Sequence, residues 1–151
     1  MFAKLTPNVT DVAAIARAAA NGGADGISAI NTLKGMAVDW RRRAPCIGAV
    51  TGGLSGPAVK PVALRMVWEI ASALPKMPVI GIGGISTADD ALEFMVAGAS
   101  AVQVGTASFV NATAAADVAG DLSRKLDAAG VARVADLIGS ISAKAGGAPK
   151  P

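Results

Sequence analysis

Two apolar segments of the sequence each run into residues with almost no side chain. The segment VIGIGGI, residues 79–85, contains Gly83 and Gly84, and the segment VQVGTAS, residues 102–108, passes into Gly105 and Thr106. Glycine allows backbone N–H groups to approach an anion closely, and the start of a following helix adds partial positive charge. Glycine can also simply end a strand, but two such loops in consecutive units favour a phosphate-binding site.

Polar side chains follow an earlier apolar segment. Asn31 and Thr32 come directly after residues 26–30, and the motif TGGLSGP at 51–57 places Gly56 just before an expected helix. A carboxamide donates and accepts hydrogen bonds side by side, which suits a planar heterocycle, and Gly56 suits a further close approach of the backbone. Asn31 is equally typical of a turn, and both interpretations stay open at this point.

The first apolar segment, residues 2–5, contains one cation, Lys4. In a strand covered on both faces, an ammonium group needs a partner because its desolvation is costly. Lys4 stands next to the carboxyl end of the expected strand, where it could face an anionic cofactor. The alternative is a lysine whose side chain extends into solvent from an exposed strand.

The sequence contains few groups for acid–base chemistry. It has no histidine and no tyrosine, so the usual general bases at neutral pH reduce to Cys46, lysines and carboxylates. No catalytic residue and no metal site is predicted within the chain. The net charge is +3, and the single basic cluster, Arg41–Arg43, is typical of a solvated loop, so nucleic-acid binding is not predicted.

Hydropathy and cysteine content predict a cytoplasmic protein without a membrane anchor. The longest uncharged run, residues 94–116, holds too many polar residues and glycines to span a membrane, and residues 1–5 lack the apolar region of a signal peptide. The single cysteine permits no internal disulfide, which fits a reducing compartment. The hydrophobic content of 52% exceeds that of most soluble domains, so an apolar surface must be covered.

The chain repeats one plan four times, a short apolar strand followed by a loop and a helix. Continuous apolar runs of this kind are typical of parallel sheets, and the alternation predicts an α/β fold. Capping residues, prolines and glycines mark the ends of the helices. Strands are expected at residues 2–5, 26–30, 79–82 and 101–104, and helices at 10–22, 57–74, 87–98, 111–129 and 131–143.

Four strand–helix units amount to half of a (βα)8 barrel, the TIM barrel. We therefore expect the C-terminal half of such a barrel, with four βα units and a C-terminal helix, over residues 1–144, and a disordered tail at 145–151. A half barrel has two open edges and an uncovered inner face, which would account for the high hydrophobic content. Ligands of these barrels bind at the carboxyl ends of the strands, where the two glycine loops would lie.

Four segments of the sequence closely resemble class 1 dihydroorotate dehydrogenases. They are KLTPNVTD (4–11), INTLKGMAVD (30–39), TGGLSGPAVKPVALRMV (51–67) and PVIGIGGISTADDALEFMVAGASAVQVGTASF (78–109). The resemblance is in particular to the C-terminal half of the NAD-linked 1B catalytic subunit, and it covers residues 3–143. It implies an FMN-containing TIM barrel that oxidises dihydroorotate to orotate in pyrimidine biosynthesis.

The same resemblance implies a role for each candidate residue. Lys4 would contact the flavin ring near N1 and O2, Ile30 would touch the ring, and Asn31 and Thr32 would bind the pyrimidine substrate. The implied contacts of FMN and its phosphate are Gly56, Gly83, Gly84, Gly105 and Thr106. The implied partners are dihydroorotate and orotate, an N-terminal half of the barrel, an FAD and iron–sulfur electron-transfer subunit, and a second copy in a homodimer.

The catalytic base of the resembled family, a cysteine on a loop of the N-terminal half, has no counterpart in this sequence. Cys46 lies in RAPCIG, where the family has ordinary apolar residues, so the chain is expected to hold half of an active site and to be inactive alone. One alternative is another flavin barrel, such as dihydropyrimidine dehydrogenase or a tRNA dihydrouridine synthase, although the latter should carry an RNA-binding extension. The other is a non-catalytic half barrel that self-associates and binds flavin or phosphate.

Overall fold

The computed structural model describes residues 1–142 and shows an α/β fold. Four parallel strands form the main sheet in the order β1 (Phe2–Leu5), β2 (Gly26–Ala29), β7 (Val79–Ile82) and β8 (Ala101–Gln103). The four predicted strands are confirmed, and β2 and β8 each end one residue earlier than expected. The expected disordered tail, 145–151, lies outside the described residues, as do residues 143–144 of the expected domain.

The register of the sheet brings the carboxyl ends of the strands to one edge. Ser28 of β2 pairs with Lys4 of β1 and with Ile80 of β7, and Ile82 of β7 pairs with Gln103 of β8. The loops that follow β2, β7 and β8 therefore begin side by side. These loops contain the polar and glycine residues predicted to form the site.

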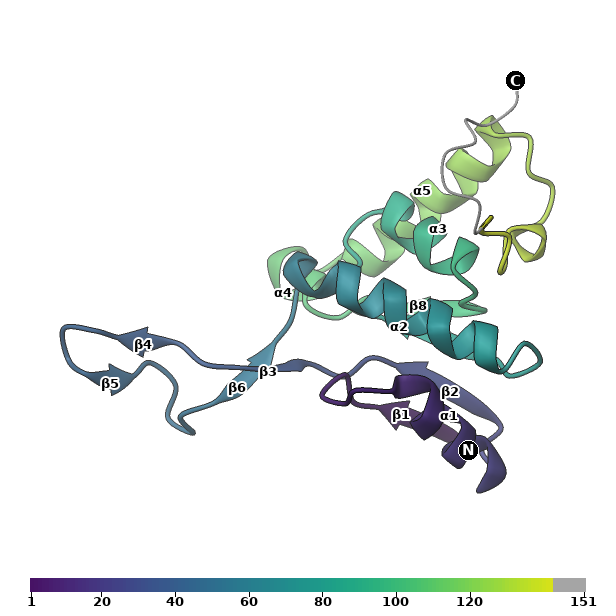
Figure 1. Ribbon diagram of the computed structural model, residues 1–151. Coiled ribbons are helices and arrows are strands. Elements are labelled where there is room, and N and C mark those ends of the chain that lie inside the picture. The colour runs from purple at the N-terminus through teal and green to yellow at the C-terminus, as the bar shows by residue number, and fades with distance from the viewer. Residues whose placement is uncertain (143–151) are drawn as a thin grey trace.

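Helices α1 (Val12–Asn21), α2 (Lys60–Ala73) and α3 (Ala88–Val96) pack on one face of the sheet (Figure 1). The short α4 (Ala107–Val110) and α5 (Ala114–Ala128) follow β8, and α5 packs against α3. A 3₁₀ turn at Pro57–Val59 leads into α2. Predicted caps are confirmed at two starts, because Asp11 accepts from the N–H of Ala14 and Thr87 from that of Asp90. Within residues 1–142, no helix has the length and apolar character needed to cross a membrane.

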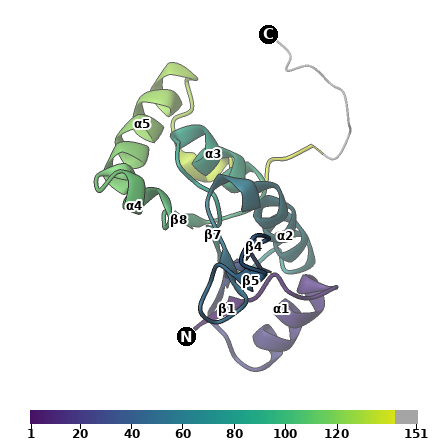
Figure 2. The ribbon, with the colours of Figure 1, turned by 90° about the vertical axis from the view of Figure 1, so that its left-hand side faces the viewer.

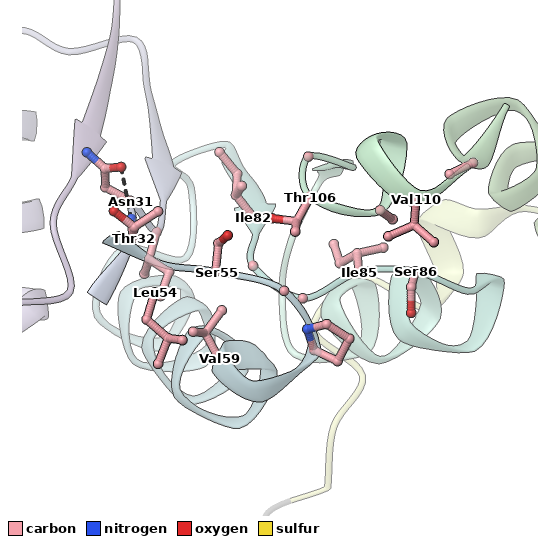
Figure 3. A pocket seen from close by; sticks show the side chains of 18 of the residues that line it. Asn31, Thr32, Leu54, Ser55, Val59, Ile82, Ile85, Ser86, Thr106 and Val110 are labelled. Carbon is pink, nitrogen blue, oxygen red and sulfur yellow. Dashed lines mark hydrogen bonds between the residues drawn. The ribbon is translucent and has the colours of Figure 1, made fainter. Parts of the chain in front are cut away.

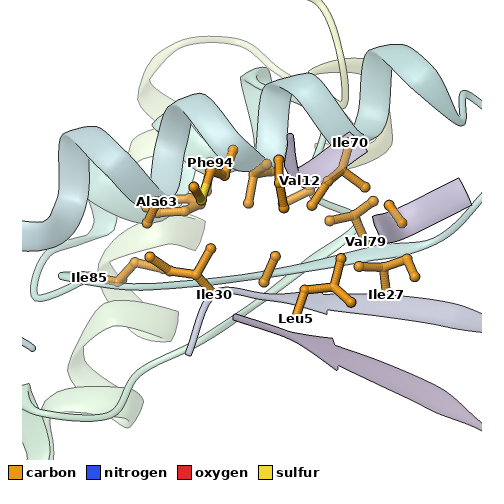
Figure 4. Packing of buried hydrophobic residues seen from close by; sticks show 14 of the residues in the cluster. Leu5, Val12, Ile27, Ile30, Ala63, Ile70, Val79, Ile85 and Phe94 are labelled. Atoms are coloured by element: carbon orange, nitrogen blue, oxygen red, sulfur yellow. The ribbon is translucent and has the colours of Figure 1, made fainter. Parts of the chain in front are cut away.

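The core lies between the sheet and the helices. Ile27 and Val79 of the strands face Val12, Ile70 and Phe94 of the helices, and all five are at most 1% exposed (Figure 4). Helix α1 lies beside β1 at one end of the sheet, and α4 and α5 lie beyond β8 at the other (Figure 2). Burial of this apolar area is the main source of stability for the fold.

The opposite face of the sheet is open in the described part of the chain. Along β1, Ala3 and Leu5 pack toward the core, whereas Phe2 and Lys4 are exposed. Phe109 of α4 is also exposed, at 94%. Residues 1–142 form no closed barrel, and β1 and β8 are the free edges of the sheet. The arrangement is consistent with part of a TIM barrel.

The connection between β2 and α2 forms an arm that projects away from the sheet (Figure 1). Its strands are two antiparallel pairs, β3 (Leu33–Gly35) with β6 (Gly52–Leu54) and β4 (Val38–Asp39) with β5 (Ala44–Pro45). No strand is predicted here from the sequence, because segments of two or three residues show no apolar periodicity. The basic cluster Arg41–Arg43 is exposed on this arm, as expected for a solvated loop.

The predicted helix at 131–143 is wrong. Within residues 131–142 the structure has a 3₁₀ turn at Val134–Asp136 and no α-helix. Gly139 has a φ of +68°, which ends helical geometry at that position. Its N–H donates instead to the carbonyl oxygen of Met95, and the N–H of Ile141 donates to that of Val96. Hydrogen bonds to the end of α3 thus replace those of a helix.

Gly81 allows β7 to pack closely against α3. A Cβ atom at Gly81 would lie 2.6 Å from Phe94 Cδ1 and 3.1 Å from Ala99 Cβ, and both residues are fully buried. We expect Gly81→Ala to lower the free energy of unfolding by about 1–3 kcal/mol, because overpacking a dense core forces strain. Gly48→Ala is the matched control, since nothing lies within 4 Å of its Cβ position. Urea unfolding measures both variants, and equal midpoints would contradict this packing.

Candidate functional site

A cavity opens where the carboxyl ends of the main strands meet (Figure 3). Its volume is about 470 Å³, within the usual range of small-molecule sites. All the site residues predicted from the sequence line it: Lys4, Ile30, Asn31, Thr32, Gly56, Gly83, Gly84, Gly105 and Thr106. The parallel register of the sheet therefore gathers the candidates around one space.

The positions around the cavity that hold glycine differ in what a side chain there would meet. At Gly83, where φ is +137°, a Cβ atom would lie 2.6 Å from Ala63 Cβ of α2. At Gly84, where φ is +75°, it would lie 2.8 Å from the carbonyl oxygen of Gly56. At Gly105 nothing lies within 4 Å of the Cβ position. The first two glycines let parts of the protein touch one another, whereas Gly105 borders open space.

Backbone N–H groups of the glycine loops are available to a ligand. Among the described residues, the N–H groups of Gly83, Gly84, Gly105 and Thr106 have no hydrogen-bond acceptor. All four residues line the cavity. Free N–H groups on neighbouring loops can jointly bind the oxygens of an anion such as phosphate. This donor set is compatible with the predicted phosphate site.

The start of α3 has fewer free N–H groups for an anion than the sequence predicts. The Asp90 carboxylate accepts hydrogen bonds from the N–H groups of Ser86 and Thr87, both at 2.9 Å. Burial alone raises the pKa of Asp90, but hydrogen bonds from Lys60, Ser86 and Thr87 outweigh it and hold the pKa well below its ordinary value of 3.8. A charged carboxylate of the protein therefore occupies the positive end of this helix.

Lys4 lies at the cavity but not in the environment predicted for it. The sequence predicts its ammonium in a strand covered on both faces, whereas the structure shows an exposed side chain on the open face of the sheet. The reason is that helices cover only one face of β1 in residues 1–142. Within those residues no carboxylate forms an ion pair with Lys4. Its charge is therefore available to an anionic ligand.

One end of the Asn31 carboxamide binds the local backbone. Its Oδ1 accepts the N–H of Thr32 at 2.9 Å (Figure 3). Its Nδ2 has no acceptor among the described residues, so it can still donate to a ligand. A Cβ atom at Gly53 would lie 2.3 Å from Thr32 Oγ1, so the Thr32 side chain occupies the space beside this glycine.

Asn8 holds the segment that carries Asn31 and Thr32. From the loop after β1, its Nδ2 donates to the Thr32 carbonyl oxygen at 3.2 Å, and its Oδ1 accepts the N–H of Lys34 at 2.9 Å. The Nδ2 also donates to Thr6 Oγ1 at 2.9 Å. Sequence reasoning missed this residue, because a polar residue in a turn carries no sign of a contact with a distant segment.

Comparison with known proteins decides the family. The family model described as dihydroorotate dehydrogenase matches residues 1–126 of this chain. The chain belongs to the dihydroorotate dehydrogenase family. It is 57% identical over 141 residues to the dihydroorotate dehydrogenase B (NAD(+)) catalytic subunit of Pelobacter propionicus, and 58% identical over 141 residues to that of Trichlorobacter lovleyi. Both alignments cover 93% of this chain and 46% of the relative, so the chain spans about half the length of the curated relatives it matches.

Few ionisable side chains line the cavity. Lys4 and Asp117 are the ionisable residues that line it. Asp117 accepts hydrogen bonds from Asn111 Nδ2 and Thr113 Oγ1, both at 2.8 Å. Cys46 is exposed on the arm and does not line the cavity. The single thiol of the sequence is therefore placed away from the candidate site.

Other residues of the cavity were missed from the sequence. Ser55 precedes Gly56 in the motif TGGLSGP, and its position next to a predicted site residue could have identified it. Asn111 and Asp117 come from the connection to α5 and its first turns, which no pattern links to the strand ends. The complete set is Leu54, Ser55, Pro57, Val59, Ile82, Ile85, Ser86, Ala107, Val110, Asn111, Ala114 and Asp117.

Gly105 and Gly84 should respond differently to substitution, because one borders open space and the other borders protein backbone. Gly105→Leu is expected to change the free energy of unfolding by less than about 0.5 kcal/mol while filling part of the cavity. Gly84→Ala is expected to cost about 1–3 kcal/mol of stability, because φ is positive and the backbone of Gly56 is in the way. Thermal unfolding of both variants tests this, and a larger stability loss at Gly105 would contradict the geometry.

Proposed function

We propose that this chain binds FMN in the cavity and supplies the FMN half of the active site of a dihydroorotate dehydrogenase, which oxidises dihydroorotate to orotate in pyrimidine biosynthesis. The observation that carries the proposal is the set of free N–H groups on the Gly83–Gly84 and Gly105–Thr106 loops. Such a set suits the phosphate of a mononucleotide at the carboxyl edge of a parallel sheet. The names of the curated relatives supply the reaction.

The character of the cavity lining fits the parts of FMN. The free N–H groups and Gly56 would hold the phosphate, and apolar side chains such as Ile30 and Ile82 would contact the ring system. Lys4 would place a positive charge near N1 and O2 of the ring, where an anionic reduced flavin gains stability. When bound, FMN supplies the acceptor for the hydride of the substrate.

The polar groups after β2 fit the substrate. Asn31 Nδ2 and the hydroxyl of Thr32 would donate to the carbonyl and carboxylate oxygens of dihydroorotate or orotate. Asn8 would keep this segment in place through its hydrogen bonds to Thr32 and Lys34. A substrate bound there would lie in the same cavity as the ring contact Ile30, which the reaction requires.

The remaining groups of the reaction would come from partners. Removal of the proton from the substrate needs a positioned base, which the family carries on a cysteine loop of the N-terminal half. The relatives are named as NAD-dependent catalytic subunits, and we infer that electrons leave through a separate FAD and iron–sulfur subunit. We also infer a homodimer for the whole enzyme and a cytoplasmic location.

A second candidate is a non-catalytic half barrel that self-associates around flavin or phosphate. The free edges of β1 and β8 and the exposed Phe2 and Phe109 favour it, since a second copy could cover them. The mass of the chain with FMN, measured by light scattering, separates the two candidates. A flavin-bearing dimer without dihydroorotate turnover would favour the second candidate.

Removal of the Lys4 charge should weaken flavin binding. Lys4→Ala is expected to raise the Kd for FMN by about 10- to 100-fold, the usual effect of losing one charge-assisted contact. Lys76→Ala is the control, because Lys76 is exposed and does not line the cavity. Quenching of flavin fluorescence measures both variants. Equal Kd values would remove Lys4 from the cofactor site.

The chain alone should not turn over dihydroorotate, because loss of a general base typically costs about 10²- to 10⁴-fold and half of the binding surface is also absent from it. The assay is dihydroorotate-dependent reduction of an artificial acceptor with added FMN. Activity is expected when the N-terminal half of the Pelobacter propionicus relative is added. Substantial turnover by the 151-residue chain alone, retained in Cys46→Ser, would contradict the proposal that this chain supplies only half of the active site.

A further inference from the structure

An ion pair joins α2 and α3, the helices that follow the Gly56 loop and the Gly83–Gly84 loop. Lys60, the first residue of α2, places its Nζ 2.6 Å from Asp90 Oδ1 and 2.9 Å from Glu93 Oε2 of α3. The Lys60 and Asp90 side chains are only 27% and 11% exposed. Both hydrogen bonds raise the pKa of Lys60 above its ordinary value of 10.5, so the lysine is charged at neutral pH.

The second oxygen of Asp90 holds the loop after β7. Its Oδ2 accepts the N–H groups of Ser86 and Thr87 at 2.9 Å, and their hydroxyl groups at 3.1 and 2.9 Å. These residues directly follow Gly83, Gly84 and Ile85 of the cavity. One carboxylate therefore connects α2 to the end of the glycine loop.

A direct contact of backbones completes the connection. A Cβ atom at Gly84 would lie 2.8 Å from the carbonyl oxygen of Gly56 and 3.0 Å from the backbone nitrogen of Lys60. The backbone of the same Lys60 that is fixed by Asp90 thus passes close to the glycine turn. Asp90 ties the loop before α3 to α2, and the missing side chain of Gly84 lets the two backbones approach.

We propose that Lys60 and Asp90 are positioning residues for the FMN phosphate, which fix the Gly56 and Gly83–Gly84 loops relative to one another without touching the ligand. The proposal rests on the proposed function, because it assumes that these loops bind the phosphate. Neither residue lines the cavity, so their effect on a ligand must pass through the loops. Phosphate affinity then depends on the ion pair, while affinity for the ring system depends on it much less.

The experiment compares FMN with riboflavin, which lacks the phosphate, on the full 151-residue chain. Lys60→Met and Asp90→Asn are expected to raise the Kd for FMN by about tenfold, as for one lost hydrogen bond to a charged group, and the Kd for riboflavin by less than twofold. Lys60→Arg should restore most of the FMN affinity. Arg65→Met is the matched control, because it breaks the exposed Arg65–Glu69 pair on the same helix. An equal loss for both ligands would show a merely structural role and overturn the proposal.

Hydrogen exchange of the ligand-free chain provides an independent measurement. Faster exchange of the amides at 83–87 in Lys60→Met and Asp90→Asn, but not in Arg65→Met, is expected. Unchanged exchange at 83–87 would overturn the positioning role. If the unsubstituted chain bound neither flavin, the proposed function would fail, while the exchange rates would still decide whether the ion pair fixes the loop.

Discussion

The close contact between the Gly84 turn and the start of α2 is the constraint on which the candidate site depends. Because Gly84 has no side chain, its backbone reaches the Gly56 carbonyl oxygen and the Lys60 backbone. The loops after β7 and before α2 therefore form one continuous wall of the cavity. A side chain at this position would separate them and move the backbone N–H groups of the Gly83–Gly84 loop.

The two lysines near the cavity, Lys60 and Lys4, have different surroundings. Lys60 and Asp90 neutralise one another in a partly buried pair, which removes them from ligand binding and makes them part of the scaffold. Lys4 stands at the open face without an ion-pair partner in residues 1–142. The charges of Lys60 and Asp90 are thus balanced within the scaffold. Lys4 is the cation at the cavity that is best placed to meet an anionic ligand.

The open face of the sheet explains the unusual composition of the chain. A hydrophobic content of 52% is high for a fold that covers only one face of its sheet, and Phe2 of β1 is exposed. The curated relatives are about twice as long as the part that matches.

The sequence by itself determined the four strands, the main helices and nine of the residues that line the cavity, because apolar runs, caps and glycines act locally and parallel strands place their ends together. The contacts that require glycine at these positions are visible only in the tertiary structure. Gly84 makes room for the Gly56 backbone and Gly53 for the Thr32 side chain, contacts between segments far apart in the chain. The strands of the arm and the loss of the helix at 131–143 were likewise decided by long-range hydrogen bonds, which local patterns do not encode.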